Sequence, residues 1–290
     1  MMCIDGMQTT LATPVRFFGV ALHSGVLSTV TIKPAIASSG IVFARKGENG
    51  CDRISATASA VVRTKLGTTI SNGGGFEVST IEHLMAALSI CGVSNAFIEI
   101  DGPELPILDG SARDFVEGLR GAQIVKLKES ATRLVVKTPI EVVDEDRFVR
   151  VVPSANSRLQ VTIDFEERAI GKNTIDLDLG DLDELIGRVG AARTFCRLED
   201  IEAMREAGLA KGGSLDNAIV VDQGKILNDS GLRHEDEFVC HKALDLIGDL
   251  ALIGMPLQGH VFAYRCGHDL NVAFANAVIQ AMQHGIVEQS

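Results

Sequence analysis

The segment CHKALDLIGD at residues 240–249 places His241, Asp245 and Asp249 at intervals of four residues. On a helix, side chains with this spacing project from nearly one face. Imidazole and carboxylate both bind Zn(II), and a catalytic zinc takes three protein ligands and leaves one position for water. Asp at this spacing also forms ordinary surface ion pairs, but these aspartates interrupt an apolar stretch, where an unpaired carboxylate is costly. The pattern therefore predicts a helix that supplies two of three metal ligands.

The third ligand must come from elsewhere, and His83 in the segment STIEHLMAAL at residues 79–88 is the best candidate. Ser and Thr before an apolar-periodic run are typical N-caps, so we expect a helix from about residue 80 to residue 90. Glu82 beside His83 can act as a general base on water at the metal, as the Glu of HExxH does, although that motif is absent. A lone His near a helix start is more often a cap or a surface residue, so the hypothesis that His83 binds metal depends on the other residues of the pattern.

His268 follows a strand-like run and a glycine, which is a common place for a residue directed into a cleft, and it is a candidate acid. A metal at this site could supply a nucleophile, since zinc lowers the pKa of its bound water to about 7 and also polarises a bound carbonyl. A nucleophilic Ser or Cys is less economical, because the chain has no Gly-x-Ser-x-Gly elbow and Cys240 points to a different helix face from His241.

A series of motifs extends this pattern over most of the chain. The chain resembles the family of zinc-dependent deacetylases that remove the N-acetyl group from UDP-3-O-acyl-N-acetylglucosamine, the committed step of lipid A synthesis. The motifs follow the family's order between about residues 8 and 271, and chance does not produce so long an ordered series. They are GVALHSG (19–25), STIEHLMAAL (79–88), PELPILDGSA (103–112), ARTF (192–195), GGSLDNAIV (212–220), GLRHEDEF (231–238) and GH (267–268).

The resemblance implies a role for each candidate residue in catalysis. The zinc ligands would be His83, His241 and Asp245. Glu82 would be the general base, and His268, held by Asp249, would be the cationic acid or oxyanion stabiliser. The Thr of the ARTF motif, Thr194, would contact the carbonyl oxygen.

The resemblance also implies contacts with an acylated UDP-amino-sugar substrate. Lys242 would bind the diphosphate, and Phe165 would pack on the uracil ring. Arg147 and Arg265 occupy places where family members often carry Lys, so the positive charge persists there. The apolar residues Leu198, Ile201 and Leu209 would line a passage for the acyl chain, although apolar residues at helical spacing more often pack in a core.

The order of expected elements predicts an α+β fold of duplicated units with the metal cleft between them, and the resemblance implies that each unit is an α/β sandwich domain. A helix and strand at residues 84–100 resemble a helix and strand at residues 244–264, which indicates a duplicated unit. We expect domains at residues 1–126 and 132–290, joined by a charged linker at residues 127–131. The second domain carries an insertion at about residues 196–226, which is the part that would form the acyl-chain passage.

Composition excludes several other classes of protein. A length of 290 residues with 46% hydrophobic residues suits two cores, and a net charge of −11 argues against a nucleic-acid partner. No apolar run is long enough to span a membrane, so membrane contact would be peripheral at most. The six cysteines show no CxxC pair, so we expect reduced thiols in a cytoplasmic protein, and we expect a monomer.

Two other functions remain open at this stage. The first is a related zinc amidohydrolase that acts on another nucleotide sugar, which would share the catalytic residues but would not need an apolar passage. The second is a non-catalytic, metal-dependent nucleotide-sugar sensor. Glu82 and His268 argue against the sensor, because a closed structural site needs neither a base nor an acid. The metal also stays open between Zn(II) and Fe(II), since a site of two His and one Asp accepts several divalent ions. The role of His23, which could lie near bound substrate or be only structural in a hairpin, is open as well.

Overall fold

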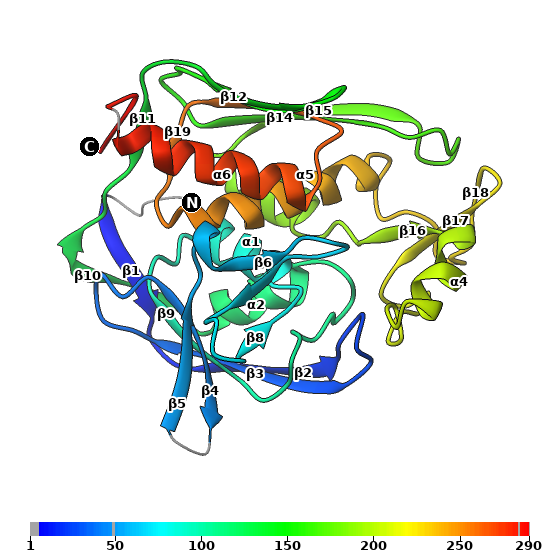
Figure 1. Ribbon diagram of the computed structural model, residues 1–290, viewed down its shortest axis with the longest axis horizontal. Coiled ribbons are helices and arrows are strands. Elements are labelled where there is room, and N and C mark those ends of the chain that lie inside the picture. Colours follow the sequence, from blue (N-terminus) through cyan, green and yellow to red (C-terminus); the bar gives the residue numbers. More distant parts are fainter. Residues whose placement is uncertain (1–5, 48–49, 284, 290) are drawn as a thin grey trace.

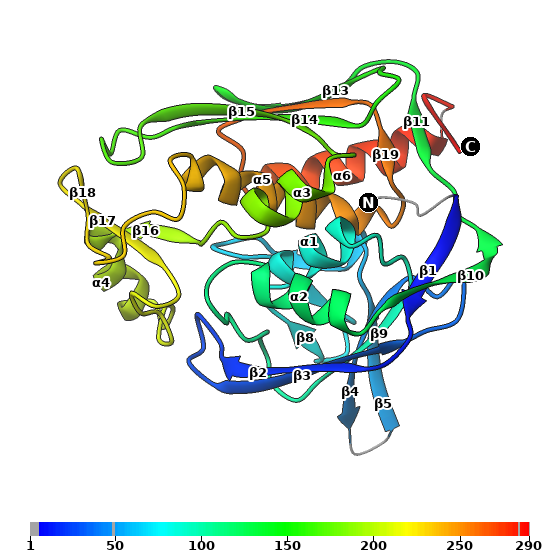
Figure 2. The same cartoon turned by 180° about the vertical axis from the view of Figure 1, so that it is seen from behind.

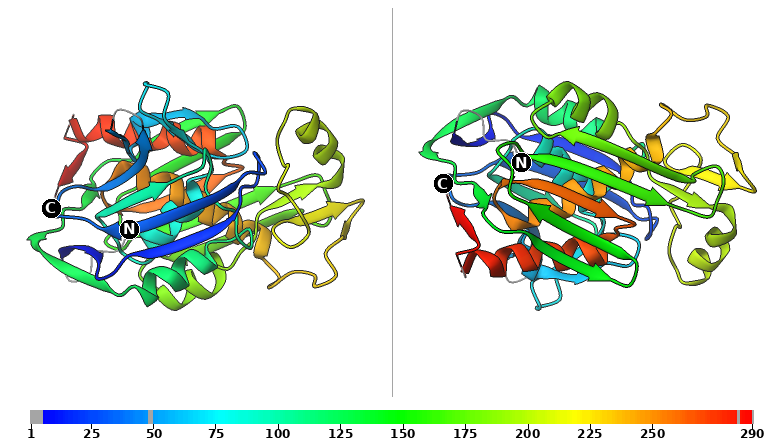
Figure 3. Two further views of the ribbon diagram at one scale, coloured as in Figure 1. Left: turned by 90° about the horizontal axis from the view of Figure 1, so that it is seen from below. Right: turned by 90° about the horizontal axis from the view of Figure 1, so that it is seen from above.

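The computed structural model describes residues 6–47, 50–283 and 285–289. Two five-stranded sheets form its outer layers, and the long helices lie between them (Figures 1 and 2). Seen from below and from above, each sheet turns one face outward, away from the helices (Figure 3). Cys3, one of the expected thiols, lies outside the described residues. So do the first residue of the first expected domain and the last residue of the second.

The first unit combines one of the five-stranded sheets with two helices. Its elements are β2 (Val15–Val20), β3 (Leu27–Pro34), β4 (Ile41–Gly47), β5 (Gly50–Ser55), α1 (Glu82–Ile90), β9 (Ala96–Ile100) and α2 (Arg113–Gly121). The strand order in the sheet is β2-β3-β9-β4-β5, with β9 antiparallel to β3 and parallel to β4.

The second unit repeats this arrangement. Its elements are β12 (Ile140–Asp144), β13 (Arg147–Val152), β14 (Arg158–Asp164), β15 (Lys172–Asp178), α5 (Glu237–Leu250), β20 (His260–Tyr264) and α6 (His268–Gln283). The strand order is β12-β13-β20-β14-β15, with β20 antiparallel to β13 and parallel to β14. Both units therefore follow the same chain order of four strands, a helix, a strand and a helix, and the expected α+β fold of two similar units is confirmed.

Each unit is interrupted between its fourth strand and its first helix. In the first unit the interruption holds a short 3₁₀ helix (Ala58–Ala60) and a small sheet of β6 (Val61–Arg63), β7 (Thr69–Ser71) and β8 (Glu77–Val78). In the second unit it holds α3 (Leu182–Glu184), a π-helical turn (Leu185–Val189), β16 (Phe195–Arg197), α4 (Leu198–Glu206), β17 (Ile219–Asp222) and β18 (Lys225–Ile226). Elements β16 to β18, with α4, project from one end of the layers in Figure 1, which agrees with an insertion at about residues 196–226.

The two central helices, α1 and α5, pack against each other across the boundary between the units. Every residue of α1 is buried, and so are most residues of α5. A helix that is apolar on all sides is typical of such a central position. The few ionisable groups on these helices are thus held away from water, where only pairing, hydrogen bonding or metal binding offsets their desolvation.

Two details concern the expected linker and the expected helix cap. The charged residues expected as a linker at 127–131 lie mostly in strand β10 (Ile124–Ser130), which pairs antiparallel with β1 (Met7–Leu11). Most residues of this strand are exposed, which suits their charged and polar side chains. The expected Ser/Thr cap is also absent: the N-cap of α1 is Ile81, and Thr80 has a left-handed φ of 56° while its hydroxyl donates to Glu104.

The remaining described elements join the ends of the second unit. A three-stranded sheet combines β11 (Leu134–Val136), β19 (Leu257–Gln258) and β21 (Val287–Gln289), and a 3₁₀ turn (Ala251–Ile253) follows α5. Among the described helices, none is long and apolar enough to cross a membrane.

Candidate metal centre and active site

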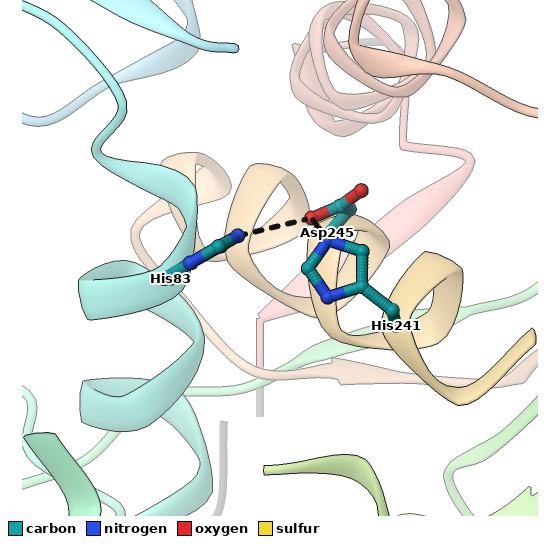
Figure 4. Close-up of side chains that lie close together, drawn as sticks. All are labelled: His83, His241 and Asp245. Carbon is teal, nitrogen blue, oxygen red and sulfur yellow. Dashed lines mark ion pairs between the residues drawn. The ribbon is translucent and has the colours of Figure 1, made fainter. Parts of the chain in front are cut away.

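Helices α1 and α5 bring His83, His241 and Asp245 together across the boundary between the two units (Figure 4). The Nε2 atoms of His83 and His241 lie 3.7 Å and 3.4 Å from Asp245 Oδ1. Two ligands of one tetrahedral zinc, each about 2.0–2.2 Å from the ion, lie roughly 3.3–3.6 Å apart. The spacing of these three atoms therefore matches that of ligands around one metal ion.

The donor set fits a metal in its chemistry as well. Asp245 Oδ1 is buried and has no hydrogen-bond partner, which is costly for a carboxylate oxygen unless a cation balances it. Burial, reinforced by His241, lowers the pKa of His83 to about 3, and burial also lowers the pKa of His241. Both imidazoles are therefore neutral at pH 7, the form that binds metal. Burial opposes ionisation of Asp245, but neighbouring His241 and Lys242 outweigh it and keep its pKa well below the usual range.

A hydrogen bond from the ring nitrogen that faces away from the ligand set fixes the tautomer of His241. Its Nδ1 donates a hydrogen bond to the carbonyl oxygen of Ala192 at 3.0 Å, so Nε2 carries the lone pair that faces Asp245 and His83. Such an outer hydrogen bond fixes the ring orientation and raises the basicity of a metal-binding histidine.

Glu82 lies beside the ligand set and is almost fully buried. Burial raises its pKa to about 7, although the charge of His268 and a hydrogen bond from the backbone N–H of Thr68 to Oε2 (2.9 Å) favour the carboxylate. A carboxyl group with a pKa near neutrality can accept a proton from water and release it again, as a general base must.

His268 is held by Asp249, whose Oδ2 accepts from Nδ1 of His268 at 2.8 Å. Burial opposes a positive charge on His268, but the charge of Asp249 and this hydrogen bond outweigh it and raise the pKa to about 10. Nε2 of the same ring lies 4.0 Å from Asp245 Oδ2, next to the ligand set. The arrangement pairs a base, Glu82, with a protonated imidazole, His268.

Lys242 contacts the ligand set, and Thr194 lies two residues after Ala192, whose carbonyl oxygen contacts His241. Thr194 precedes β16, and its backbone N–H donates to the carbonyl oxygen of Gly110 in the first unit (2.8 Å). Lys242 Nζ donates to Asp245 Oδ2 at 2.7 Å and lies 5.6 Å from the centre of the Phe195 ring. Lys242 thus presents its charge at the edge of the ligand set.

Phe165 follows β14 and is partly exposed, with its ring edge-on to Phe195 at 5.6 Å between centroids. The two arginines expected near the diphosphate are already paired. Arg147 contacts Asp144 and Asp269, the latter at 2.9 Å, and Arg265 contacts Asp146. A phosphate would have to compete with these carboxylates, so the phosphate role of both arginines stays a prediction.

A cavity of about 380 Å³ opens between the insertion of the second unit and the β2–β3 turn. Leu198 and Ile201 of α4 line it, as expected, whereas Leu209 lines a neighbouring cavity of about 420 Å³ together with Phe165. The other residues that line the cavity of about 380 Å³ are mostly apolar and include Leu22, Thr194, Phe195, Leu215 and Val220. The cavity has room for an apolar chain that starts near Thr194.

His23 also lines this cavity, and its contacts indicate a structural part. Its Nε2 donates to the carbonyl oxygen of Leu66 at 2.8 Å, and its backbone N–H donates to Glu104 at 2.9 Å. The buried Glu104 carboxylate also accepts from Ser24 and from Thr80. Glu104 lies within the PELPILDGSA motif at residues 103–112, but no role was expected for it. Its signal was an acidic residue between apolar neighbours.

A second group of potential ligands, His234, Asp236 and Cys240, also lies close together. The guanidinium of Arg188 already neutralises the charge of Asp236. The carbonyl oxygen of Arg188 contacts His234 Nε2 at 3.1 Å. Burial raises the pKa of the Cys240 thiol to about 12, so it does not offer a thiolate. This group is satisfied as an ion-pair cluster.

Comparisons with known proteins agree with the geometry. The sequence model of the UDP-3-O-acyl N-acetylglycosamine deacetylase family matches residues 8–280. A protein named UDP-3-O-acyl-N-acetylglucosamine deacetylase from Phenylobacterium zucineum is 44% identical over 279 residues, which cover 95% of this chain and 92% of that protein. Proteins of the same name from Geobacter sp. strain M21 and Myxococcus xanthus are each 46% identical over 264 residues, covering 91% of this chain and 86% and 83% of theirs. With nearly its whole length matched, the chain belongs to the UDP-3-O-acyl N-acetylglycosamine deacetylase family.

Proposed function

We propose that this protein hydrolyses the N-acetyl group of UDP-3-O-(3-hydroxyacyl)-N-acetylglucosamine. The products would be acetate and UDP-3-O-acyl-glucosamine, and the reaction would serve lipid A synthesis. The observation that supports this most directly is the buried set of His83, His241 and Asp245 with Glu82 and protonated His268 beside it. The family to which the chain belongs carries the same activity in its name.

The metal would be Zn(II), held by His83, His241 and Asp245. Two imidazoles and one carboxylate leave a coordination position open, as catalytic zinc sites do, and Zn(II) would supply a Lewis acid that activates water and polarises the amide carbonyl. Fe(II) is the alternative, because the same donor set binds it. The buried, unpartnered Asp245 Oδ1 supports a cation of either kind.

The side chains around the metal would move the protons. Glu82 would accept the proton of the attacking water, since its pKa of about 7 allows it to do so near neutral pH. The Thr194 hydroxyl and protonated His268 would stabilise the negative charge that develops on the carbonyl oxygen. Either Glu82, now protonated, or His268 would then donate a proton to the departing sugar nitrogen. Asp249 would keep His268 oriented and would favour its protonated form.

The substrate would bind across the second unit. Lys242 would meet the diphosphate, Phe165 would pack on the uracil ring, and the cavity lined by Leu198 and Ile201 would take the acyl chain. Arg147 and Arg265 would add positive charge once released from their carboxylate partners. We further propose a cytoplasmic monomer with at most peripheral membrane contact and no nucleic-acid partner, in line with the net charge of −11.

Acetate release from the acylated substrate by purified protein tests this function. We expect turnover that a chelator abolishes and added Zn(II) restores, with Fe(II) assayed in parallel under anaerobic conditions. Equal turnover of a substrate without the O-acyl chain would favour an amidohydrolase for another nucleotide sugar. Binding without turnover in the metal-loaded protein would favour a nucleotide-sugar sensor.

A further inference from the structure

Thr68 lies between the base and the acid of the proposed reaction, and it contacts the residues that hold both. It is fully buried in the loop before β7, in the interruption of the first unit. Its backbone N–H donates to Glu82 Oε2 at 2.9 Å. Its hydroxyl donates to Asp249 Oδ1 at 2.6 Å and lies 3.4 Å from Nδ1 of His268. Thr68 therefore contacts both the Glu82 carboxylate and the Asp249 carboxylate that holds His268.

The main chain of Thr68 is tied to α1 as well. Its carbonyl oxygen accepts from the N–H of Ile81, the N-cap residue of the helix that carries Glu82 and His83. The neighbouring Gly67 comes so close that a Cβ there would lie 3.1 Å from Glu82 Oε1. The loop around Thr68 thus lies directly on the Glu82 carboxylate and leaves it little freedom to rotate.

The hydroxyl of Thr68 completes the hydrogen bonding of Asp249, which belongs to the other unit. Asp249 Oδ2 accepts from His268 Nδ1 at 2.8 Å and from Asn271 Nδ2 at 2.9 Å, while Thr68 supplies the donor at Oδ1. A carboxylate with donors at both oxygens has one preferred orientation. The orientation of Asp249 in turn sets that of the His268 ring.

From these contacts we propose that Thr68 is a positioning residue that holds Glu82 and the His268–Asp249 pair in one arrangement across the boundary between the units. The proposal rests on the proposed function for its catalytic meaning. A base and an acid on separate units must stay within a few tenths of an ångström of their working positions, and small displacements are costly to turnover. Thr68 fixes both with a single side chain and its own backbone.

The test compares Thr68→Val, which keeps the shape and the backbone N–H but removes the hydroxyl, with Thr68→Ser, which keeps the hydroxyl. Thr69→Val is the matched control, because Thr69 is also buried and its hydroxyl donates to the neutral Ser79 hydroxyl at 3.0 Å. A hydrogen bond to a charged group is worth about tenfold to a hundredfold in an equilibrium. We expect Thr68→Val to lower kcat by about that factor with KM within about twofold, and Thr68→Ser to recover most of it.

A second measurement does not depend on turnover. In the ¹H NMR spectrum of the zinc-loaded protein, the Nδ1–H proton of His268 is assigned by its loss in His268→Gln. We expect this resonance to shift, or to vanish by exchange with water, in Thr68→Val and to stay in place in Thr68→Ser and Thr69→Val. Thr68→Ala, a second variant without the hydroxyl, should match Thr68→Val in both measurements.

Three outcomes would overturn the proposal. In the first, Thr68→Val retains wild-type kcat and an unchanged His268 resonance. In the second, Thr69→Val loses as much as Thr68→Val. In the third, both variants without the hydroxyl lose metal or fail to fold, which would make the role of Thr68 structural. A wild-type protein without turnover would instead refute the proposed function, while the NMR comparison would still decide whether Thr68 orients His268.

Discussion

The side chains of Arg193 and Glu237 form a buried two-point ion pair that joins the segment before β16 to the first turn of α5. The distances are 2.8 Å from Arg193 Nε to Glu237 Oε1 and 3.0 Å from Nη2 to Oε2. Glu237 also accepts from the backbone N–H groups of Arg193 and Arg233. Because Ala192 and Thr194 flank Arg193, this pair places both the carbonyl that orients His241 and the hydroxyl expected at the substrate carbonyl.

Replacing one member of this pair should destabilise the fold. Glu237→Ala leaves a buried, uncompensated guanidinium, and the loss of one partner of a buried pair typically costs about 3–5 kcal/mol. Urea unfolding followed by circular dichroism measures the change. The double variant Arg193→Met with Glu237→Leu is the control, because it removes both charges and should recover part of the loss. A double variant less stable than Glu237→Ala would contradict this account.

Replacing Glu82 should lower turnover without loss of metal, whereas replacing any of the three metal ligands should lower the metal content. Glu82→Ala should retain the metal while turnover falls by about 10²- to 10⁴-fold, the usual contribution of a general base. His83→Ala, His241→Ala and Asp245→Ala should instead lose metal, because each removes one of three donors. Metal content by atomic emission, measured beside acetate release, distinguishes the two classes. Metal loss from Glu82→Ala equal to that from His83→Ala would refute the base assignment.

Asp249 should keep His268 protonated at neutral pH in the metal-free protein. The pKa of His268 is raised to about 10, so the stabilisation from its charge is fully present below an unfolded pKa of about 6.5 and is lost as pH rises through about 10. In Asp249→Asn the largest contribution that raises the pKa is removed, so the pKa should fall well below about 10.

An NMR titration of the His268 ring in both metal-free proteins measures the two pKa values. The difference in unfolding free energy between wild type and Asp249→Asn should shrink as pH rises from about 6.5 to about 10. A His268 pKa that is the same in both proteins would rule out Asp249 as the cause.

Filling the cavity beside α4 should change the choice of acyl chain. Ile201→Trp adds volume within the lining, so kcat/KM for long-chain substrates should fall by about tenfold or more, while short-chain substrates are affected less. Val143→Trp, on the exposed face of β12, is the matched control and should leave both unchanged. A parallel loss for short and long chains from Ile201→Trp would show that the cavity does not hold the acyl chain.

Several elements could be predicted from the sequence because their signals are local. The helix expected from about residue 80 to residue 90 is α1, and the helix and strand expected within residues 244–264 are the end of α5 and β20. The spacing of His241 and Asp245 placed both on one helix face, as α5 has them. The pairing of the expected linker residues with β1 could not be predicted in this way, because the two strands are far apart in the sequence.

The pairing of Arg147 and Arg265 with aspartates could not be predicted, since it depends on which loops meet around β13 and β20. The same holds for Thr68, which carries no motif of its own. Its partner Asp249 lies 181 residues further along the chain. No periodicity in the sequence relates positions so far apart.

The sequence by itself determined the types of the reactive groups, their intervals within each helix and the duplicated order of elements, because these depend on local periodicity and side-chain chemistry. Only the tertiary structure decided that α1 lies against α5, which brings His83 to His241 and Asp245. It also decided the burial that keeps the imidazoles neutral and raises the pKa of Glu82 to about 7. Burial and long-range contact arise from packing of the whole chain, and a short segment of sequence does not contain them.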